Sequence, residues 1–232
     1  MNATILALVL TITTIMSTHA RDTVVLLHGL ARTTHSMKKM ESALDAEGFR
    51  VLNLSYPSRK HSIEDLATMV RRKITGETKR GERIHFVAHS LGAIIIRHIQ
   101  SVQPIANIGR VVMLSPPNQG SEVVDKLGCL PVFKWLNGPA GTQLGTSPDG
   151  FVSKLKPINF EVAVITGDRS INWILSCMIS GKDDGKVSTA SARLDGMKAF
   201  KIVHSSHPFI MKNRKVISDV ATFLGTGSFP AD

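Results

Sequence analysis

Aromatic residues and cysteines are scarce in this sequence. Its 232 residues include two Trp, one Tyr and two Cys, and aromatic residues make up 5% of the chain. Single-stranded nucleic acids are bound on aromatic side chains along a basic groove, and no basic stretch here is interleaved with aromatics, so no nucleic-acid partner is expected. In an exported protein Cys129 and Cys177 permit one disulfide. The alternative is two separate buried thiols.

Charged side chains are absent from the first 20 residues, which contain no Asp, Glu, Lys or Arg. This segment centres on the apolar run at residues 5–10 and ends in Thr18, His19 and Ala20, with small residues at both positions that determine cleavage. The pattern predicts a secretory signal peptide cut after Ala20, and therefore a secreted or periplasmic protein. A retained membrane anchor is the alternative, but the apolar part is short for a bilayer span.

Low-complexity tracts and internal repeats are also absent, and 232 residues are too few for two ordinary enzyme domains with separate cores. We therefore expect a single domain over residues 21–232. Acidic residues are outnumbered, 18 against 28 basic ones, which gives a net charge of +10. Most of this excess is expected on solvated helix faces. The alternative is attraction to an anionic membrane or envelope surface.

Short apolar runs alternate with helical patterns along the chain. The run at residues 23–27 is typical of a strand buried on both faces, and further strands are expected at residues 50–54, 110–114, 160–165 and 199–203 and in the run that begins at Ile84. Apolar spacing predicts helices over residues 36–46, 62–75, 91–102 and 209–224, with stops at Gly48 and Gly76 and a capping pair of Ser62 and Asp65. This alternation predicts an α/β fold, with a mostly parallel sheet and helices on both faces.

The interval between the strands at residues 110–114 and 160–165 is long and contains several prolines and glycines. It holds an apolar group that the main core does not need: Val123, Val124, Leu127, Leu130, Val132, Phe133, Trp135 and Leu136. We interpret residues 117–157 as a small cap over the site. An irregular connection packed on the edge of the domain is the alternative, and it too would lie where a substrate enters.

A candidate nucleophile lies at Ser90, where a serine interrupts the apolar run at residues 84–96. Ala88 and Gly92 stand two residues before it and two after it. In a nucleophile elbow these positions are small, because a strand and a helix pass closely on either side of a strained serine. The pattern therefore predicts that the Ser90 hydroxyl projects above the edge of the sheet.

A serine hydroxyl is a weak nucleophile without a base, and the base needs an acid to orient it. In this architecture the acid and then the histidine follow the serine along the chain. His207, between the last strand and the last helix, is the first choice for the base, ahead of His204. Asp184 is the first choice for the acid, and Asp168 and Asp183 are the alternatives.

The tetrahedral intermediate of such a reaction needs two backbone N–H donors. One is expected from Leu91, directly after the nucleophile. The other is expected from Leu30, in the turn after the first buried strand, where Gly29 lets the chain pass close to the site. The sequence thus predicts an oxyanion hole made by Leu30 and Leu91.

Five segments together resemble one family: His28-Gly29-Leu30, Ala88-His89-Ser90-Leu91-Gly92, Ser115-Pro116-Pro117-Asn118-Gln119-Gly120-Ser121, Asp184-Gly185-Lys186-Val187 and His207. They are similar to the α/β-hydrolases of the lipase and inositol-deacylase-like group, over nearly the whole mature chain. The resemblance implies an α/β-hydrolase fold and a serine esterase or lipase acting on a small-molecule or lipid ester. Its site residues would be Ser90, Asp184 and His207, with no metal or cofactor.

The chain departs from the family pattern at two places. Ala88 stands where glycine is usual, and residues 171–179 form an inserted segment ahead of the acid.

Two other functions would use the same serine, histidine and acid. One is an acyltransferase that passes the acyl group to an alcohol or amine, and the other is a binding protein on a hydrolase scaffold that has lost its activity.

Overall fold

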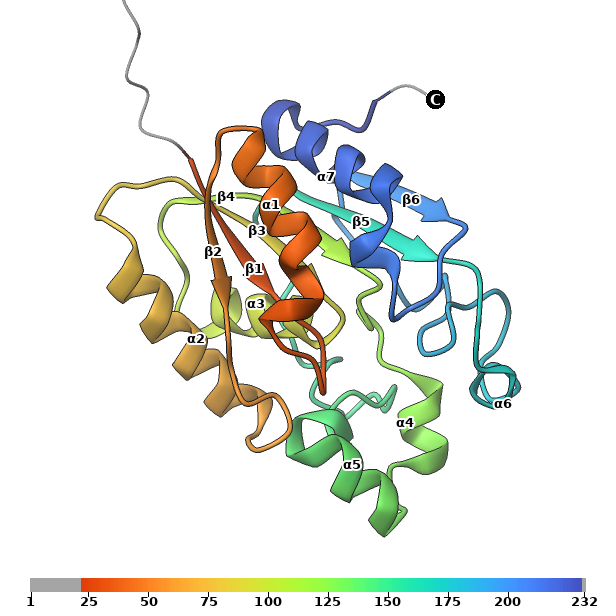
Figure 1. Ribbon diagram of the computed structural model, residues 1–232. Coiled ribbons are helices and arrows are strands. Elements are labelled where there is room, and N and C mark those ends of the chain that lie inside the picture. Colours follow the sequence, from red (N-terminus) through yellow and green to blue (C-terminus); the bar gives the residue numbers. More distant parts are fainter. Residues whose placement is uncertain (1–21, 231–232) are drawn as a thin grey trace, which may run out of the picture.

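The computed structural model describes residues 22–230, so the predicted signal peptide, residues 1–20, lies outside the described residues. One sheet contains the strands β1 (Thr23–Leu27), β2 (Arg50–Leu54), β3 (Ile84–His89), β4 (Ile108–Leu114), β5 (Val162–Gly167) and β6 (Ala199–Val203). Their order is β2-β1-β3-β4-β5-β6, and every neighbouring pair is parallel (Figure 1). The predicted α/β fold is confirmed.

Strand positions follow the apolar runs closely. β1, β2 and β6 have the predicted bounds, whereas β4 begins two residues before the predicted start and β5 both begins and ends two residues later than predicted. Alternate residues of β1 enter two separate cores: Val25 and Leu27 lie in one, Val24 and Leu26 in the other. The continuous apolar run was a strand signal because both faces of this strand are buried.

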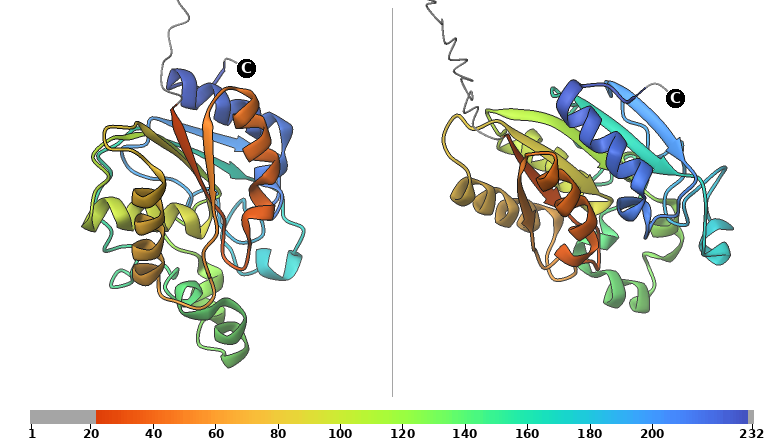
Figure 2. Two further views of the ribbon diagram at one scale, coloured as in Figure 1. Left: turned by 60° about the vertical axis from the view of Figure 1, so that its left-hand side comes forward. Right: turned by 45° about the horizontal axis from the view of Figure 1, so that its top comes forward.

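Helices cover both faces of the sheet (Figure 2). On one face, α1 (Lys38–Ala46) and α7 (Arg214–Thr226) contribute Met40 and Phe223 to the core that contains Val24. On the other, α2 (Ile63–Glu77) and α3 (Leu91–Val102) contribute Leu66 and Ile95 to the core that contains Val25. The central strands of the sheet are therefore buried between two helical layers, and the ends of the strands are open for a site.

The helix bounds were predicted within two residues except at the start of the last helix. The Ser62 hydroxyl accepts the amide hydrogen of Asp65 at 3.2 Å, so the capping pair at the start of α2 is confirmed. The predicted stop at Gly76 is wrong, because α2 continues to Glu77. The tail does not form one helix from residue 209 either: a 3₁₀ turn over Ile210–Lys212 precedes α7, and Asn213 caps α7 through its side chain.

Three short helices gather at the carboxyl ends of the strands (Figure 1). They are α4 (Glu122–Leu127), α5 (Pro131–Thr142) and α6 (Trp173–Ser176), the last of which lies in the inserted segment at residues 171–179. α5 is interrupted at Gly138, whose φ of 67° only glycine adopts readily. Whether residues 117–157 act as a cap on a single domain stays a prediction.

The two cysteines are free and exposed. Cys129 follows α4 and Cys177 caps the end of α6, so each thiol faces solvent from its own segment. The disulfide that the sequence permitted is not formed in this structure, and neither thiol is buried. Among residues 22–230, none of the helices has the length and apolar character needed to span a bilayer.

Candidate active site

Ser90 stands between β3 and α3 in a strained backbone conformation. Its φ is 53°, a region that costs a non-glycine residue of order 1–3 kcal/mol. The Ser90 amide donates to the carbonyl of Leu114 in the neighbouring strand at 2.9 Å, which holds the turn in place. The Ser90 side chain faces a cavity above the sheet. These features are those of the nucleophile elbow that the sequence predicted.

Gly92 shows why the elbow needs small residues. A Cβ atom built on Gly92 would lie 2.7 Å from the carbonyl oxygen of Leu27 in β1, which is backbone and cannot turn away. We expect Gly92→Ala to lower the free energy of unfolding by about 1–3 kcal/mol, the usual cost of overpacking. Gly76→Ala is the matched control, because a Cβ atom at Gly76 in α2 meets nothing within 4 Å. Denaturant unfolding that gave both variants the same midpoint would contradict this account.

His207 lies in the loop after β6 and contacts Ser90. Its Nε2 is 3.1 Å from the Ser90 hydroxyl oxygen, and both side chains are buried. The loop is held from two sides: the His207 amide donates to the Asp184 carbonyl at 2.9 Å, and Nε2 of His89 donates to the His207 carbonyl at 3.0 Å. Burial, followed by the nearby charge of His207, keeps the pKa of His89 well below its ordinary value. His89 is therefore a neutral support for the loop.

Asp184 lies behind His207. Its Oδ2 accepts a hydrogen bond from Nδ1 of His207 at 2.8 Å, and its Oδ1 accepts from the amides of Lys186 and Val187 at 3.1 and 3.0 Å. Burial by itself raises the pKa of this carboxyl, but the His207 charge and these hydrogen bonds outweigh burial, so the pKa lies below its ordinary value. Asp184 is therefore held as a carboxylate that orients His207.

The alternative acid and base candidates lie elsewhere. Asp168 accepts from His204 at 3.1 Å, and the His204 side chain is exposed. Asp183 accepts from the hydroxyl of Ser176 and the amide of Gly185, each at 2.7 Å. The structure thus brings together Ser90, His207 and Asp184, the first choices from the sequence, and it separates them from Asp168, Asp183 and His204.

The predicted oxyanion donors flank Ser90. Leu91 is the first residue of α3, so its amide has no acceptor inside the helix, and Leu30 lines the cavity beside Ser90. Gly29 is required at its position, since a Cβ atom there would lie 2.6 Å from Nδ1 of His89. Ala31, next to Leu30, has a φ of 55°. The backbone of the loop after β1 therefore has little conformational freedom. That the amides of Leu30 and Leu91 form an oxyanion hole stays a prediction.

Tyr56 and Ser58 hold this loop, and neither was predicted from the sequence. The Tyr56 hydroxyl donates to the His28 carbonyl, and its ring stacks on the His28 ring with centroids 4.0 Å apart. The Ser58 hydroxyl accepts from the Ala31 amide at 3.1 Å. One signal was available: β2 and β1 are parallel neighbours, so the loops after them meet at the same edge.

A cavity of about 410 Å³ lies over Ser90 and His207. The apolar group of the predicted cap contributes part of its lining, namely Val123, Val124, Leu127, Phe133 and Leu136, together with Ile171 and Leu175 of the inserted segment. Three other members of that group, Leu130, Val132 and Trp135, are exposed and do not line the cavity, and Leu136 both lines it and is exposed. The cavity thus offers an apolar surface next to the Ser90 side chain. Among residues 22–230, no cluster of His, Cys, Asp or Glu could hold a metal ion.

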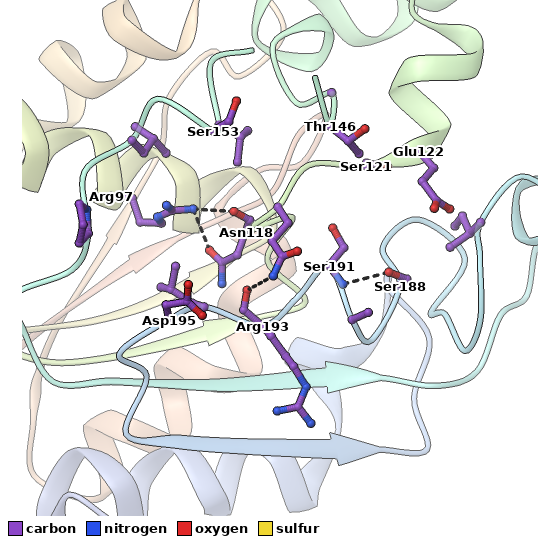
Figure 3. Close-up of a pocket in the computed structure, with 18 residues that line it drawn as sticks. Arg97, Asn118, Ser121, Glu122, Thr146, Ser153, Ser188, Ser191, Arg193 and Asp195 are labelled. Carbon is purple, nitrogen blue, oxygen red and sulfur yellow. Dashed lines mark hydrogen bonds between the residues drawn. The ribbon is translucent and has the colours of Figure 1, made fainter. Parts of the chain in front are cut away.

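A second cavity, of about 710 Å³, contains neither Ser90 nor His207 (Figure 3). Nη1 of the buried Arg97 in α3 donates to the Asn118 carbonyl at 2.8 Å, and Asn118 Nδ2 donates to the Ala192 carbonyl at 2.9 Å. From the same turn, the Ser121 hydroxyl donates to the Lys186 carbonyl at 2.8 Å. These hydrogen bonds connect α3 and the turn after β4 to the loop that carries Asp184.

Comparison with known proteins identifies the family and agrees with the fold. A family model described as the alpha/beta hydrolase family matches residues 24–203. The chain therefore belongs to the alpha/beta hydrolase family. No curated protein matches the chain by sequence.

Solved structures share the fold at low sequence identity. A lipase of Bacillus licheniformis, BlEst2 in its mature form, is 17% identical with a TM-score of 0.67, over 91% of this chain and 94% of that one. The phospholipase PlaB of Legionella pneumophila is 18% identical with a TM-score of 0.61, over 75% of this chain and 45% of that one. The thioesterase BorB from the borrelidin biosynthetic cluster is 16% identical with a TM-score of 0.59, over 90% and 93%.

Proposed function

We propose that this protein is a serine hydrolase that cleaves carboxylic esters through an acyl-enzyme on Ser90. The observation that carries the proposal is the buried chain of hydrogen bonds from Ser90 through His207 to Asp184, at 3.1 and 2.8 Å, on the floor of a cavity. This is the arrangement in which a histidine takes the proton of a serine hydroxyl and a carboxylate steadies the resulting imidazolium.

The reaction follows from these positions. Oγ of Ser90 attacks the acyl carbonyl while Nε2 of His207 takes its proton, and the amides of Leu30 and Leu91 bind the oxyanion. His207 then gives the proton to the leaving alcohol as the C–O bond breaks. A water molecule, deprotonated by His207, attacks the acyl-enzyme and releases the carboxylic acid, and the proton returns to Ser90.

The cavity lining indicates the acyl part of the substrate. Apolar side chains from α4, α5 and the inserted segment surround the reactive serine, which suits an acyl chain rather than a sugar or a peptide backbone. The lipase BlEst2 and the phospholipase PlaB share the fold, which agrees with a lipid or small-molecule ester. With the predicted signal peptide, the site of action would be outside the cytoplasm.

A fluorophosphonate probe tests the proposal directly. We expect stoichiometric labelling of Ser90, located by peptide mass spectrometry, and loss of ester hydrolysis in step with labelling. A chain that hydrolyses no p-nitrophenyl ester and leaves the probe unbound would be a binding protein on a hydrolase scaffold. Products analysed with an added acceptor alcohol separate the remaining alternative, since a new ester formed in place of the free acid would identify an acyltransferase.

A further inference from the structure

Two cationic side chains line the cavity over Ser90. Arg32 comes from the loop after β1, two residues beyond Leu30, and Lys186 comes from the loop that carries Asp184. β1 lies on one side of β3 and β5 lies on the other side, beyond β4, so the two loops approach Ser90 from opposite directions. Both residues are exposed, so a molecule in the cavity reaches them from solvent.

Neither cation has a partner within the part of the chain that the structure describes. No hydrogen-bond acceptor and no acid contacts either side chain, whereas Arg50 pairs with Glu82 and Arg110 with Glu161. Asp184 is the third charged residue in the lining, but it is fully buried and already accepts from His207 and from two backbone amides. The mouth of the cavity therefore carries positive charge without a counter-ion.

The two charges also act on each other. Although the Lys186 side chain is exposed at the surface, desolvation by the surrounding protein lowers its pKa below the ordinary value, and the positive charge of Arg32 lowers it further, against the opposing effect of Asp184. Holding two like charges near one another is unfavourable unless an anion lies between them. The remainder of the lining, from Leu127 to Leu136 and at Leu175, is largely apolar and provides no such anion.

We propose that the substrate is an ester in which an apolar acyl chain lies close to a negatively charged group, a phosphate or a carboxylate, and that Arg32 and Lys186 bind this group. The inference rests on the proposed esterase function and names its substrate class. The apolar lining takes the acyl chain, the carbonyl sits at Ser90, and the anion of the alcohol part lies at the mouth. A charged head group and an apolar chain then occupy separate parts of one cavity.

Matched substrates test the proposal. Dihexanoyl-phosphatidylglycerol and dihexanoylglycerol, supplied as monomers, share their acyl chains, and only the first carries a phosphate. Hexanoyl-lactate and its methyl ester form the corresponding soluble pair with a carboxylate. We expect the wild-type protein to hydrolyse the anionic member of at least one pair with a kcat/KM about tenfold higher, and the pair that shows the preference identifies phospholipid or soluble ester as the source.

Variants assign the preference to the two residues. Arg32→Gln and Lys186→Gln should each reduce kcat/KM for the preferred anionic ester about fivefold, the size of one solvent-facing ion pair. Because the Lys186 amide also bonds Asp184, each effect is measured as the ratio of kcat/KM for the anionic ester to kcat/KM for p-nitrophenyl hexanoate in the same variant. Lys134→Gln is the matched control, because Lys134 is an exposed cation on α5 outside the cavity lining. In the double variant Arg32→Glu with Lys186→Glu, the neutral member of the pair should become the better substrate.

The outcomes separate the inference from the proposed function. A wild-type protein that hydrolyses p-nitrophenyl hexanoate but treats both members of each pair alike would overturn the inference and leave the esterase intact. A preference that Lys134→Gln reduces as much as Arg32→Gln would also overturn it, because the overall charge would then be responsible. Absence of hydrolysis of every ester, including p-nitrophenyl hexanoate, would overturn the proposed function itself.

Discussion

Replacement of Ser90 by alanine is expected to reduce kcat for p-nitrophenyl esters by a factor of about 10⁴–10⁶, the range found when the nucleophile of a serine hydrolase is removed. The reason is chemical: alanine has no oxygen to attack the carbonyl, so no acyl-enzyme forms and His207 has no proton to accept at Nε2. The remaining rate would come from binding and from the oxyanion donors alone. Initial rates over a range of ester concentrations measure this effect.

Two controls make the Ser90 result specific. The Ser90→Ala protein should keep the circular dichroism spectrum and thermal midpoint of the wild type, or exceed that midpoint, because alanine removes no contact except the hydrogen bond to His207. Ser218→Ala should retain full activity, since Ser218 is an exposed serine on α7, away from the cavity. A folded Ser90→Ala protein with wild-type turnover would disprove the role of Ser90.

Asp184→Asn is expected to lower kcat by about 10⁴, with little change in KM. An asparagine offers an amide N–H as well as an oxygen toward Nδ1 of His207, so it neither holds the productive tautomer nor balances the imidazolium charge. The Asp184 carboxylate is fully buried and bonded to His207 at 2.8 Å, so water cannot take over these tasks. Steady-state kinetics at neutral pH provide the measurement.

Asp168→Asn is the matched control for the acid. Asp168 is the carboxylate at the end of β5, but its partner is the exposed His204 rather than His207. The Asp168→Asn variant should therefore keep its activity within about twofold of the wild type, because a surface ion pair contributes little free energy. Equal losses in Asp168→Asn and Asp184→Asn would mean that the acid has been assigned wrongly.

The turn that carries Ser90 could be predicted because it depends on local sequence. The apolar run before Ser90, the small residues on both sides of it and the resumption of apolar residues define a strand, a turn and a helix within 19 residues, and the structure has β3, Ser90 and α3 there. The buried strands were predictable for the same reason, since a strand buried on both faces is a continuous apolar run. The stop at Gly76 was not predictable in this way, because an exposed glycine with open space around it does not oblige the helix to stop.

The choice among three aspartates could not be made from the sequence with the same security. Asp183 and Asp184 are adjacent, and only the loop conformation decides which carboxylate turns inward. A positive φ of 98° at Gly185 and two amides that bond the Asp184 side chain hold that carboxylate inward, while Asp183 bonds Ser176 and Gly185 instead. The residues joined by these hydrogen bonds follow neither helix nor strand periodicity. The sequence pattern therefore does not reveal these hydrogen bonds.

What the sequence determined by itself is the fold class, most strand positions and the set of groups from which a site could be built. These properties follow from hydrophobic periodicity and turn chemistry, which act over a few neighbouring residues. The tertiary structure decided which groups meet: Asp184 with His207, Tyr56 with the loop after β1, and Arg32 with Lys186 at the mouth of the cavity. These meetings depend on the parallel sheet, because the loops that follow all of its strands emerge at one edge whatever their separation along the chain.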